Sequence, residues 1–173
     1  LDNVVVAIQK AEMVLRMVPE LELLIAELGS EGRLLDLQLK EILGGTGFEE
    51  ENIIKDYIVG NGKTKYEDVI TEIRNLKYED LLDLKSIARI IGYDSNDNIA
   101  EISVKPKGYR VLSKIPKMPL GIIENLVKKF KTLNGIMDAS ISDLDEVDGI
   151  GEVRAQNINQ SLRKMKEQYL YIR

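Results

Sequence analysis

The sequence predicts an all-α protein in two parts, an acidic helical region over residues 1–100 and a smaller basic helical domain over residues 101–173. Apolar residues recur three and four positions apart along most of the chain, which is helical spacing. No series of strands with alternating apolar and polar residues is present. Residues 1–104 carry 11 Lys and Arg against 21 Asp and Glu, a net −10, and residues 105–173 carry 13 against 8, a net +5. This charge asymmetry suggests an acidic structural part followed by a basic part that could meet a polyanion.

The first region begins with a helical pattern over residues 3–28, whose apolar positions are Val4, Ile8, Ala11, Leu15, Val18, Leu21, Leu24, Ile25 and Leu28. Pro19 lies within this pattern and is expected to kink or divide the helix, because proline lacks an N–H and clashes with the preceding turn. GSEG at residues 29–32 offers a glycine to end this helix and Ser30 to cap the next one. That next helix is expected to end at GGTG, residues 44–47.

Further helices are expected over about residues 48–59, ending at GNGK, and over about residues 65–75. YEDLLDLKSIARIIGY, residues 78–93, indicates a short helical turn and then a longer helix that stops at Gly92. GGTG and GNGK lack the spacing of phosphate-binding loops and follow no strand, so they are interpreted as turns between helices.

The boundary between the two parts is expected at DSNDN, residues 94–98, the most polar and turn-prone run in the chain. The segment that follows, residues 101–116, has β-branched residues but also Pro106, Gly108 and Pro116. Prolines and glycine disfavour a strand inside a sheet, so this segment is interpreted as an extended linker.

The composition excludes several classes of site. The chain has no cysteine and no histidine, which excludes disulfides, zinc sites of Cys and His, and triads that depend on imidazole. No run approaches the roughly 20 apolar residues of a membrane-spanning helix, and no signal-like segment is present. An intracellular protein is expected, and the start at Leu1 indicates a piece of a longer chain. The acidic clusters GFEEEN and YEDLLD are interpreted as exposed helix starts, not as catalytic groups.

A helical hairpin near the C-terminus is the most specific pattern. Ser140 and Asp143 resemble a capping box, and Gly149-Ile150-Gly151 is expected to reverse the chain into a second helix. The glycines allow positive φ and leave the backbone bare where a phosphate would touch it, and Ile150 would enter the core. The N–H groups that begin the second helix form a local anion site. Positive charge on that helix comes from Arg154, Arg163, Lys164 and Lys166.

An imperfect second copy of the hairpin lies upstream. Residues 118–122 align with residues 147–151 at an offset of 29 residues, although the glycine pair is missing there. Two such hairpins would straddle a duplex and contact both backbones, with lysines nearby at Lys114, Lys117, Lys128, Lys129 and Lys131.

The segment VDGIGEVRAQNI, residues 147–158, resembles the helix-hairpin-helix signature h-P-G-I-G-x-x-x-A-x-x-I of proteins that bind DNA without reading its sequence. Asp148 departs from the usual proline and places a carboxylate beside the expected phosphate. The resemblance implies a tandem helix-hairpin-helix domain of the RuvA domain 2-like type. Its expected DNA-binding residues here are Gly149, Ile150, Gly151, Arg154, Arg163, Lys164, Lys114 and Lys117.

Stretches outside the hairpin, such as ELGSEGRLLDLQ and PKGYRVLSKIPKMP, extend a resemblance to the DisA family of DNA integrity scanning proteins over essentially all 173 residues. This implies a helical spacer and DNA-binding tail of a homo-octamer in the bacterial cytoplasm, associated with the nucleoid and not with a membrane. Branched DNA, contacted through its phosphates, is the implied partner and suppresses the cyclase.

In that family an N-terminal domain condenses two ATP molecules, with a divalent metal, into cyclic di-AMP. Its Asp-Gly-Ala and Arg-His-Arg motifs are absent from this chain, so no catalytic residue, metal or cofactor is expected here.

Two other functions remain open from the sequence. A DNA glycosylase of the helix-hairpin-helix type would need a catalytic Lys or Asp downstream and often iron–sulfur cysteines. Only about 22 residues follow Gly151 and no cysteine exists, which disfavours that class. In a protein-interaction scaffold the hairpins would bind another chain, and binding that falls steeply with salt would argue against it.

Overall fold

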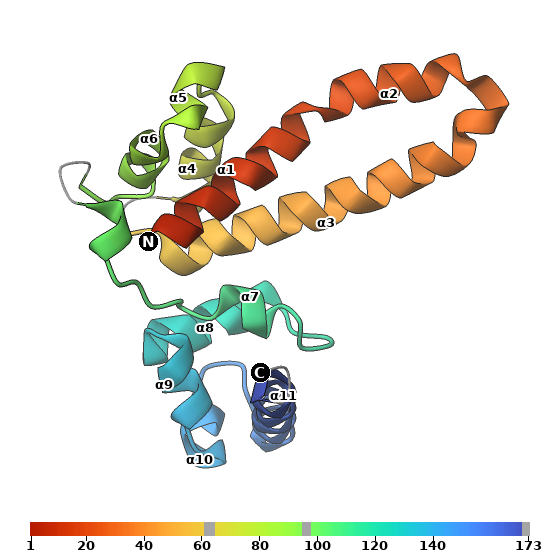
Figure 1. Cartoon of the computed structure of the whole chain (residues 1–173). Coiled ribbons are helices and arrows are strands. Elements are labelled where there is room, and N and C mark those ends of the chain that lie inside the picture. Colours follow the sequence, from red (N-terminus) through yellow and green to blue (C-terminus); the bar gives the residue numbers. More distant parts are fainter. Residues whose placement is uncertain (61–64, 95–97, 171–173) are drawn as a thin grey trace. The chain divides into compact units, whose positions relative to one another are not determined.

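The computed structural model describes residues 1–60, 65–94 and 98–170 of the chain. In that part of the chain every regular element is a helix, as the sequence predicted (Figure 1). The chain divides into two compact units, Leu1–Val104 and Lys105–Arg173, each with its own hydrophobic core.

The first unit contains a long helical arm. Helices α1 (Asp2–Arg16) and α2 (Val18–Glu27) run in one direction, and α3 (Arg33–Tyr57) returns beside them (Figure 1). A 3₁₀ turn, η1 (Gly29–Gly32), connects the two sides at the tip. Pro19 divides the first helical pattern as expected and occupies the first turn of α2, where its missing N–H leaves no bond unmade.

Two local predictions for this arm are wrong. Helix α3 continues through GGTG instead of ending there. The glycines of this stretch lie on the open surface of the helix, where a Cβ added at Gly44, Gly45 or Gly47 would meet nothing within 4 Å. Each glycine weakens the helix by about 1 kcal/mol, which the packing of α3 against α1 offsets. Ser30 caps no helix, since the 3₁₀ turn passes directly into α3 without a side-chain cap.

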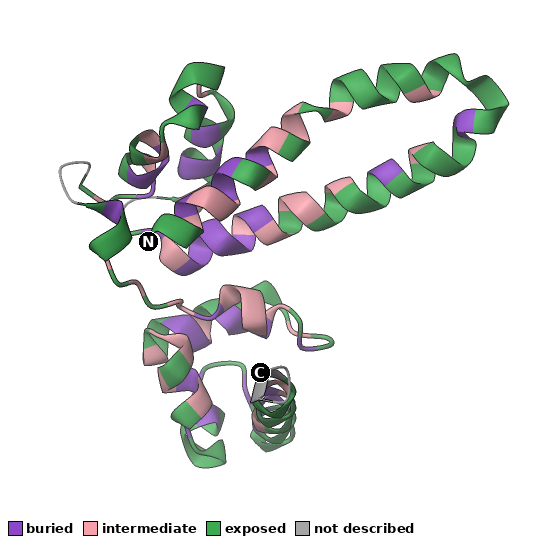
Figure 2. Ribbon diagram, in the orientation of Figure 1, coloured by how far each residue is buried: buried purple, intermediate pink, exposed green. Residues whose placement is uncertain are grey.

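The core of the first unit lies at the base of the arm, where α1 and α3 meet α4 (Tyr66–Arg74), α5 (Tyr78–Leu82) and α6 (Leu84–Ile90). Figure 2 shows buried positions gathered there, while the distant part of the arm is mostly exposed. Helices α5 and α6 match the predicted short and long helices, and α6 is followed by Gly92 at φ +98°. Residues 61–63 of the predicted GNGK turn lie outside the described residues.

The first unit extends slightly past the boundary expected at residue 100. The 3₁₀ turn η2 (Ile99–Glu101) buries Ile99, and Ile102 and Val104 pack against the same core. Residues 95–97 of the DSNDN run lie outside the described residues. Apolar side chains downstream of the polar run therefore decide where the first unit ends.

Two carboxylates are buried between α1 and α3. Glu50 is 1% exposed and Glu12 2% exposed, and both oxygens of Glu50 and Oε2 of Glu12 accept no hydrogen bond from a described donor. Glu12 Oε1 accepts a bond from Arg16 Nε at 2.7 Å. Burial, and secondarily the negative charge of Glu12, raises the pKa of Glu50 from 4.5 to about 7, while Arg74 opposes the rise and Glu51 adds to it. Protonated Glu50 can donate to Glu12 Oε2, which gives a partner to that oxygen and to one of the two Glu50 oxygens.

The second unit contains α7 (Tyr109–Leu112), α8 (Leu120–Phe130), α9 (Leu133–Asp138), α10 (Ile141–Asp145) and α11 (Glu152–Leu170). Its core includes the fully buried side chains of Leu112, Leu126, Leu144, Ala155 and Ile158. The predicted extended linker is only partly correct. Residues 102–107 form no helix, but Gly108 at φ +122° turns the chain into α7, which buries Leu112.

Candidate nucleic-acid interface

The predicted C-terminal hairpin is formed by α10, a tight turn and α11. The capping box is present: Ser140 Oγ accepts a bond from the Asp143 N–H at 3.1 Å, and Asp143 accepts one from the Ser140 N–H at 2.9 Å. The Ser140 side chain, helped by this backbone N–H, lowers the pKa of Asp143. Val147 and Ile150 are buried, and the Ile150 N–H donates to the Val147 carbonyl at 2.9 Å. Ile150 therefore anchors the turn in the core, as predicted.

The two glycines of the turn differ in backbone conformation and in the space around them. Gly149 has φ +80°, in the left-handed region that favours glycine, and a Cβ there would lie 2.7 Å from Ile122 Cδ1. Gly151 has no positive φ, and a Cβ there would meet no atom within 4 Å. The fold thus explains Gly149, whereas Gly151 leaves bare backbone facing open space at the start of α11.

Contacts from neighbouring segments hold this turn in place. Asn125 Nδ2 on α8 donates to the Asp148 carbonyl at 3.0 Å. Arg154 NH1 donates to the Gly149 carbonyl at 2.6 Å. Arg154 was expected only to add positive charge near a phosphate, but it also stabilises the turn. The Arg154 side chain is exposed, and its guanidinium carries further N–H donors besides the one that bonds the Gly149 carbonyl.

Helix α8 also braces the hairpin through a lysine. Lys129 Nζ donates to the Asp143 carbonyl at 2.8 Å and pairs with Glu146 Oε2 at 2.9 Å. Lys129, which the sequence analysis named as a charge near the DNA, therefore uses its ammonium group in contacts within the fold. Asn125 was missed by sequence reasoning, since a lone amide on a helix has no pattern that reveals its distant partner.

The upstream segment has the same backbone fold as this hairpin, but in a different register from the predicted one. Its turn residue of positive φ is Lys117, at +58°, which corresponds to Gly149 at +80°. The Ile123 N–H donates to the Pro119 carbonyl at 3.2 Å, as the Ala155 N–H donates to the Gly151 carbonyl at 2.9 Å. The offset between the two copies is thus 32 residues.

The predicted offset of 29 is wrong because it matched Gly121 and Ile122 to the glycine turn. Gly121 actually lies in the first turn of α8, where it corresponds to Val153. The buried positions repeat with the same offset of 32, since the pairs are Leu112 with Leu144, Ile115 with Val147, Ile123 with Ala155 and Leu126 with Ile158. One signal could have found this register: Pro116 falls where the helix-hairpin-helix signature has its proline.

The two hairpins therefore present different groups at equivalent places. Lys117 carries a side chain where the second hairpin has Gly149, and a lysine at positive φ is uncommon. Pro119 stands where the second hairpin has Gly151, and proline has no N–H to offer an anion. The first hairpin therefore adds an ammonium group at the turn and lacks the one N–H that Gly151 supplies in the second.

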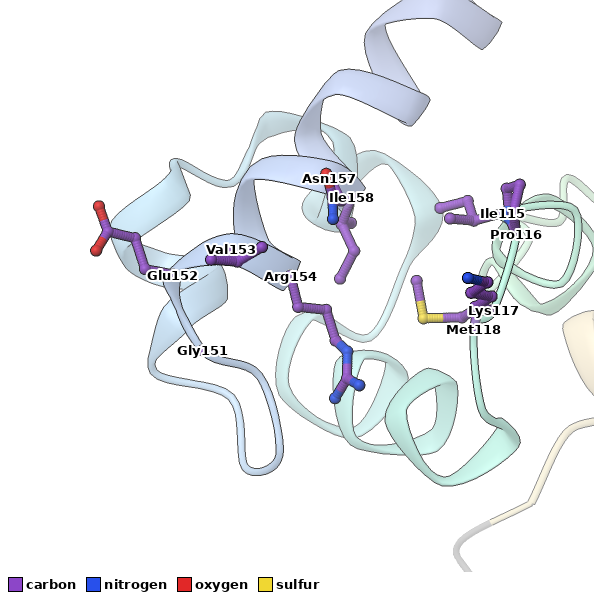
Figure 3. Close-up of a pocket in the computed structure, with 10 residues that line it drawn as sticks. All are labelled: Ile115, Pro116, Lys117, Met118, Gly151, Glu152, Val153, Arg154, Asn157 and Ile158. Carbon is purple, nitrogen blue, oxygen red and sulfur yellow. The ribbon is translucent and has the colours of Figure 1, made fainter.

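A groove of about 530 Å³ lies between the turn of the first hairpin and the start of α11 (Figure 3). Lys117 and Arg154 lie along it, with Gly151 at one side. Met118 extends toward Ile158 and Arg154, whereas the carboxylate of Glu152 points away. The structure thus brings together three of the predicted residues, from both hairpins, around one groove.

The remaining predicted residues lie at different places in the second unit. Arg163 follows Arg154 by nine residues, two and a half turns at about 3.6 residues per turn, so it lies on the opposite side of α11. There it lines a separate hollow that includes Met137 of α9. Lys164 is exposed and lies seven residues after Asn157, so both are on the same face of α11. Because Asn157 lines the groove, Lys164 lies on the groove side of the helix. Lys114 is exposed in the turn after α7.

The described residues contain no group of three or more His, Cys, Asp or Glu side chains placed to hold a metal ion. None of the described helices is long and apolar enough to cross a membrane.

The paired helices, the glycine turn and the repeated backbone define a helix-hairpin-helix protein, and residues 122–170 match the family described as helix-hairpin-helix motif. Residues 1–100 match the DisA bacterial checkpoint controller linker region. The chain therefore belongs to the DisA family, as the sequence resemblance indicated.

Similar proteins support this assignment over nearly the whole chain. The DNA integrity scanning protein DisA of Acetivibrio thermocellus is 46% identical over 168 residues, which are 97% of this chain and 46% of that protein. The DisA protein of Carboxydothermus hydrogenoformans is 48% identical over 98% of this chain and 48% of that protein, and that of Clostridioides difficile is 42% identical over 95% and 46%. The chain spans about half the length of these relatives.

Proposed function

We propose that residues 105–173 bind DNA through its phosphates, without reading its sequence, as the C-terminal part of a DNA integrity scanning protein. The observation that carries this proposal is Gly151, whose bare backbone faces open space at the start of α11, where no steric contact requires a glycine. A phosphate there would accept bonds from the first N–H groups of the helix and meet the positive end of its dipole. Arg154 and Lys117 would add charge-assisted contacts along the groove.

The charge distribution supports DNA binding by the second unit and not by the first. The first unit carries a net −10, which repels DNA, and the second unit a net +5. Two hairpins in one unit, each with groups that can bind phosphate, suit contact with more than one backbone strand. We infer that branched DNA, which presents strands from more than one duplex, is the preferred partner.

We further infer that the first unit is a spacer in a homo-oligomer of the full-length protein, in the bacterial cytoplasm near the nucleoid. In this proposal a cyclase domain outside this chain forms cyclic di-AMP from ATP with a divalent metal, and the present chain has no enzymatic activity. Exposed apolar side chains along the arm, which include Leu23, Leu24, Leu34, Leu37, Ile42 and Phe48, are compatible with contacts to other protein surfaces.

The first test is a fluorescence-anisotropy titration of the chain against a labelled four-way junction and a linear duplex of matched sequence, at several salt concentrations. We expect tighter binding to the junction and an affinity that falls as salt rises. Equal affinities would refute the preference for branched DNA. Absence of binding to both would refute DNA binding by this chain and favour the alternative of a protein-interaction scaffold.

Arg154→Ala tests the type of contact. Because a phosphate contact carries no sequence information, the variant should lose affinity equally on unrelated duplexes and lower the salt slope by about one. A loss confined to one sequence would show that Arg154 contacts base edges instead. Since Arg154 also donates to the Gly149 carbonyl, circular dichroism and thermal melting must establish that the variant is folded.

A further inference from the structure

The groove between the two hairpins has a composition that phosphate binding alone does not require. Its floor and walls are largely apolar, with Pro116, Met118, Val153 and Ile158 contributing. Val153 lies in the first turn of α11 and is 75% exposed, so the core does not explain why this residue is apolar. An exposed apolar wall beside cationic groups marks a site for a ligand that is itself both apolar and anionic.

A nucleotide whose base has left the duplex has this dual character. Its base has an apolar face that stacks on or packs against apolar side chains, and its phosphates need cations or N–H donors. Here Lys117 and Arg154 lie along the groove, and the bare backbone of Gly151 forms part of its edge. The volume of about 530 Å³ falls within the roughly 300–1,000 Å³ of small-molecule sites.

One polar side chain in the groove matches the edge of a base. Asn157 lies on α11 one turn beyond Val153 and lines the groove beside Ile158 (Figure 3). An amide offers a donor and an acceptor together, the pattern with which asparagine binds base edges. The carboxylate of Glu152, which would repel a phosphate, points away from the groove.

We propose that the groove between the hairpins binds one unpaired nucleotide, with its base between Met118 and Val153, its edge at Asn157 and its phosphates at Lys117 and Arg154. This inference rests on the proposed function and deepens it. It gives the interface a means to prefer DNA with an unstacked base, such as a bulge or a strand end at a branch, over an intact duplex.

The test compares three labelled DNAs of one sequence: a fully paired duplex, the same duplex with a single-nucleotide bulge, and the same bulge carrying an abasic residue. All three have nearly the same phosphates, and the two bulged DNAs differ only in the base. We expect the chain to bind the bulge at least fivefold more tightly than the abasic bulge. The Val153→Ser and Asn157→Ala variants should each reduce this ratio toward one and change the affinity for the paired duplex by less than twofold.

Both substitutions are at exposed positions, so the fold should tolerate them. Asn159→Ala makes the same change as Asn157→Ala two residues further along α11, on the other side of the helix and outside the groove. It is the matched control and should keep the full ratio. Equal affinities of the wild-type chain for the two bulged DNAs would overturn the nucleotide site and leave the proposed DNA binding standing. If the chain binds the four-way junction but none of these three DNAs, the nucleotide site is overturned and the proposed function stands. Failure to bind the junction as well would overturn the proposed function itself.

Discussion

Replacing each hairpin glycine separately by alanine distinguishes a folding role from a binding role. At Gly149, φ is +80° and a Cβ would approach Ile122 Cδ1 to 2.7 Å. The left-handed backbone costs a non-glycine residue about 1–2 kcal/mol, and alanine recovers about 0.4–1 kcal/mol by restricting the unfolded chain. With the strain of moving Ile122 included, Gly149→Ala should lower the free energy of unfolding by about 1 kcal/mol or more.

At Gly151 the same change has little reason to affect folding. The added methyl group meets no atom within 4 Å and φ is not positive. Alanine restricts the unfolded chain but is a poorer helix N-cap than glycine, and these effects, each about 0.5–1 kcal/mol, oppose each other. The methyl group would instead hold a phosphate away from the backbone N–H groups. Loss of one charge-assisted bond, about 1.5–3 kcal/mol, corresponds to a loss of affinity of at least tenfold.

The assay combines urea denaturation, which measures stability, with anisotropy titration against the four-way junction. Gly45→Ala is the matched control, since Gly45 also faces open space, but in the middle of α3 of the other unit. It should stabilise the chain by up to about 1 kcal/mol and leave DNA binding unchanged. If Gly151→Ala bound the junction as tightly as the wild-type chain, the bare backbone of α11 would not be the phosphate site.

Two further predictions concern other parts of the chain. The unfolded chain releases the Glu50 proton near pH 4.5 and the folded chain near pH 7, so the free energy of unfolding should fall as the pH rises between these values. Glu50→Gln cannot ionise and can donate to Glu12, so in urea denaturation it should add about 2–3 kcal/mol of stability at pH 8 and little at pH 4.5. Glu41→Gln, the same change at an exposed position, is the control variant. Equal effects of Glu50→Gln at both pH values would contradict the raised pKa of Glu50. On α11, Lys164→Ala should weaken junction binding more than Arg163→Ala in the anisotropy assay, because only Lys164 lies on the groove side, and the reverse order would move the interface to the other face of the helix.

Local patterns in the sequence were sufficient for the fold class, most helices and the second hairpin. The period of the apolar residues, Pro19 at the division of the first helix and the Ser140 capping box each act within a few residues of themselves. The glycine turn was recognised for the same reason, since positive φ at Gly149 is a local requirement. Whether GGTG would break a helix was not a local matter, because the packing of α3 on α1 offsets the weak propensity of its glycines.

What only the tertiary structure decided was which distant residues meet. The positive φ of Lys117, which matches that of Gly149, came only from the structure, because a lysine carries no sequence signal for left-handed backbone. Likewise, the close approach of Glu12 and Glu50 depends on the register of α1 against α3. The sequence by itself determined the helices, the glycine turn and the charge of each part. The groove between the hairpins and the buried carboxylate pair exist only because packing brings together side chains that are tens of residues apart in the chain.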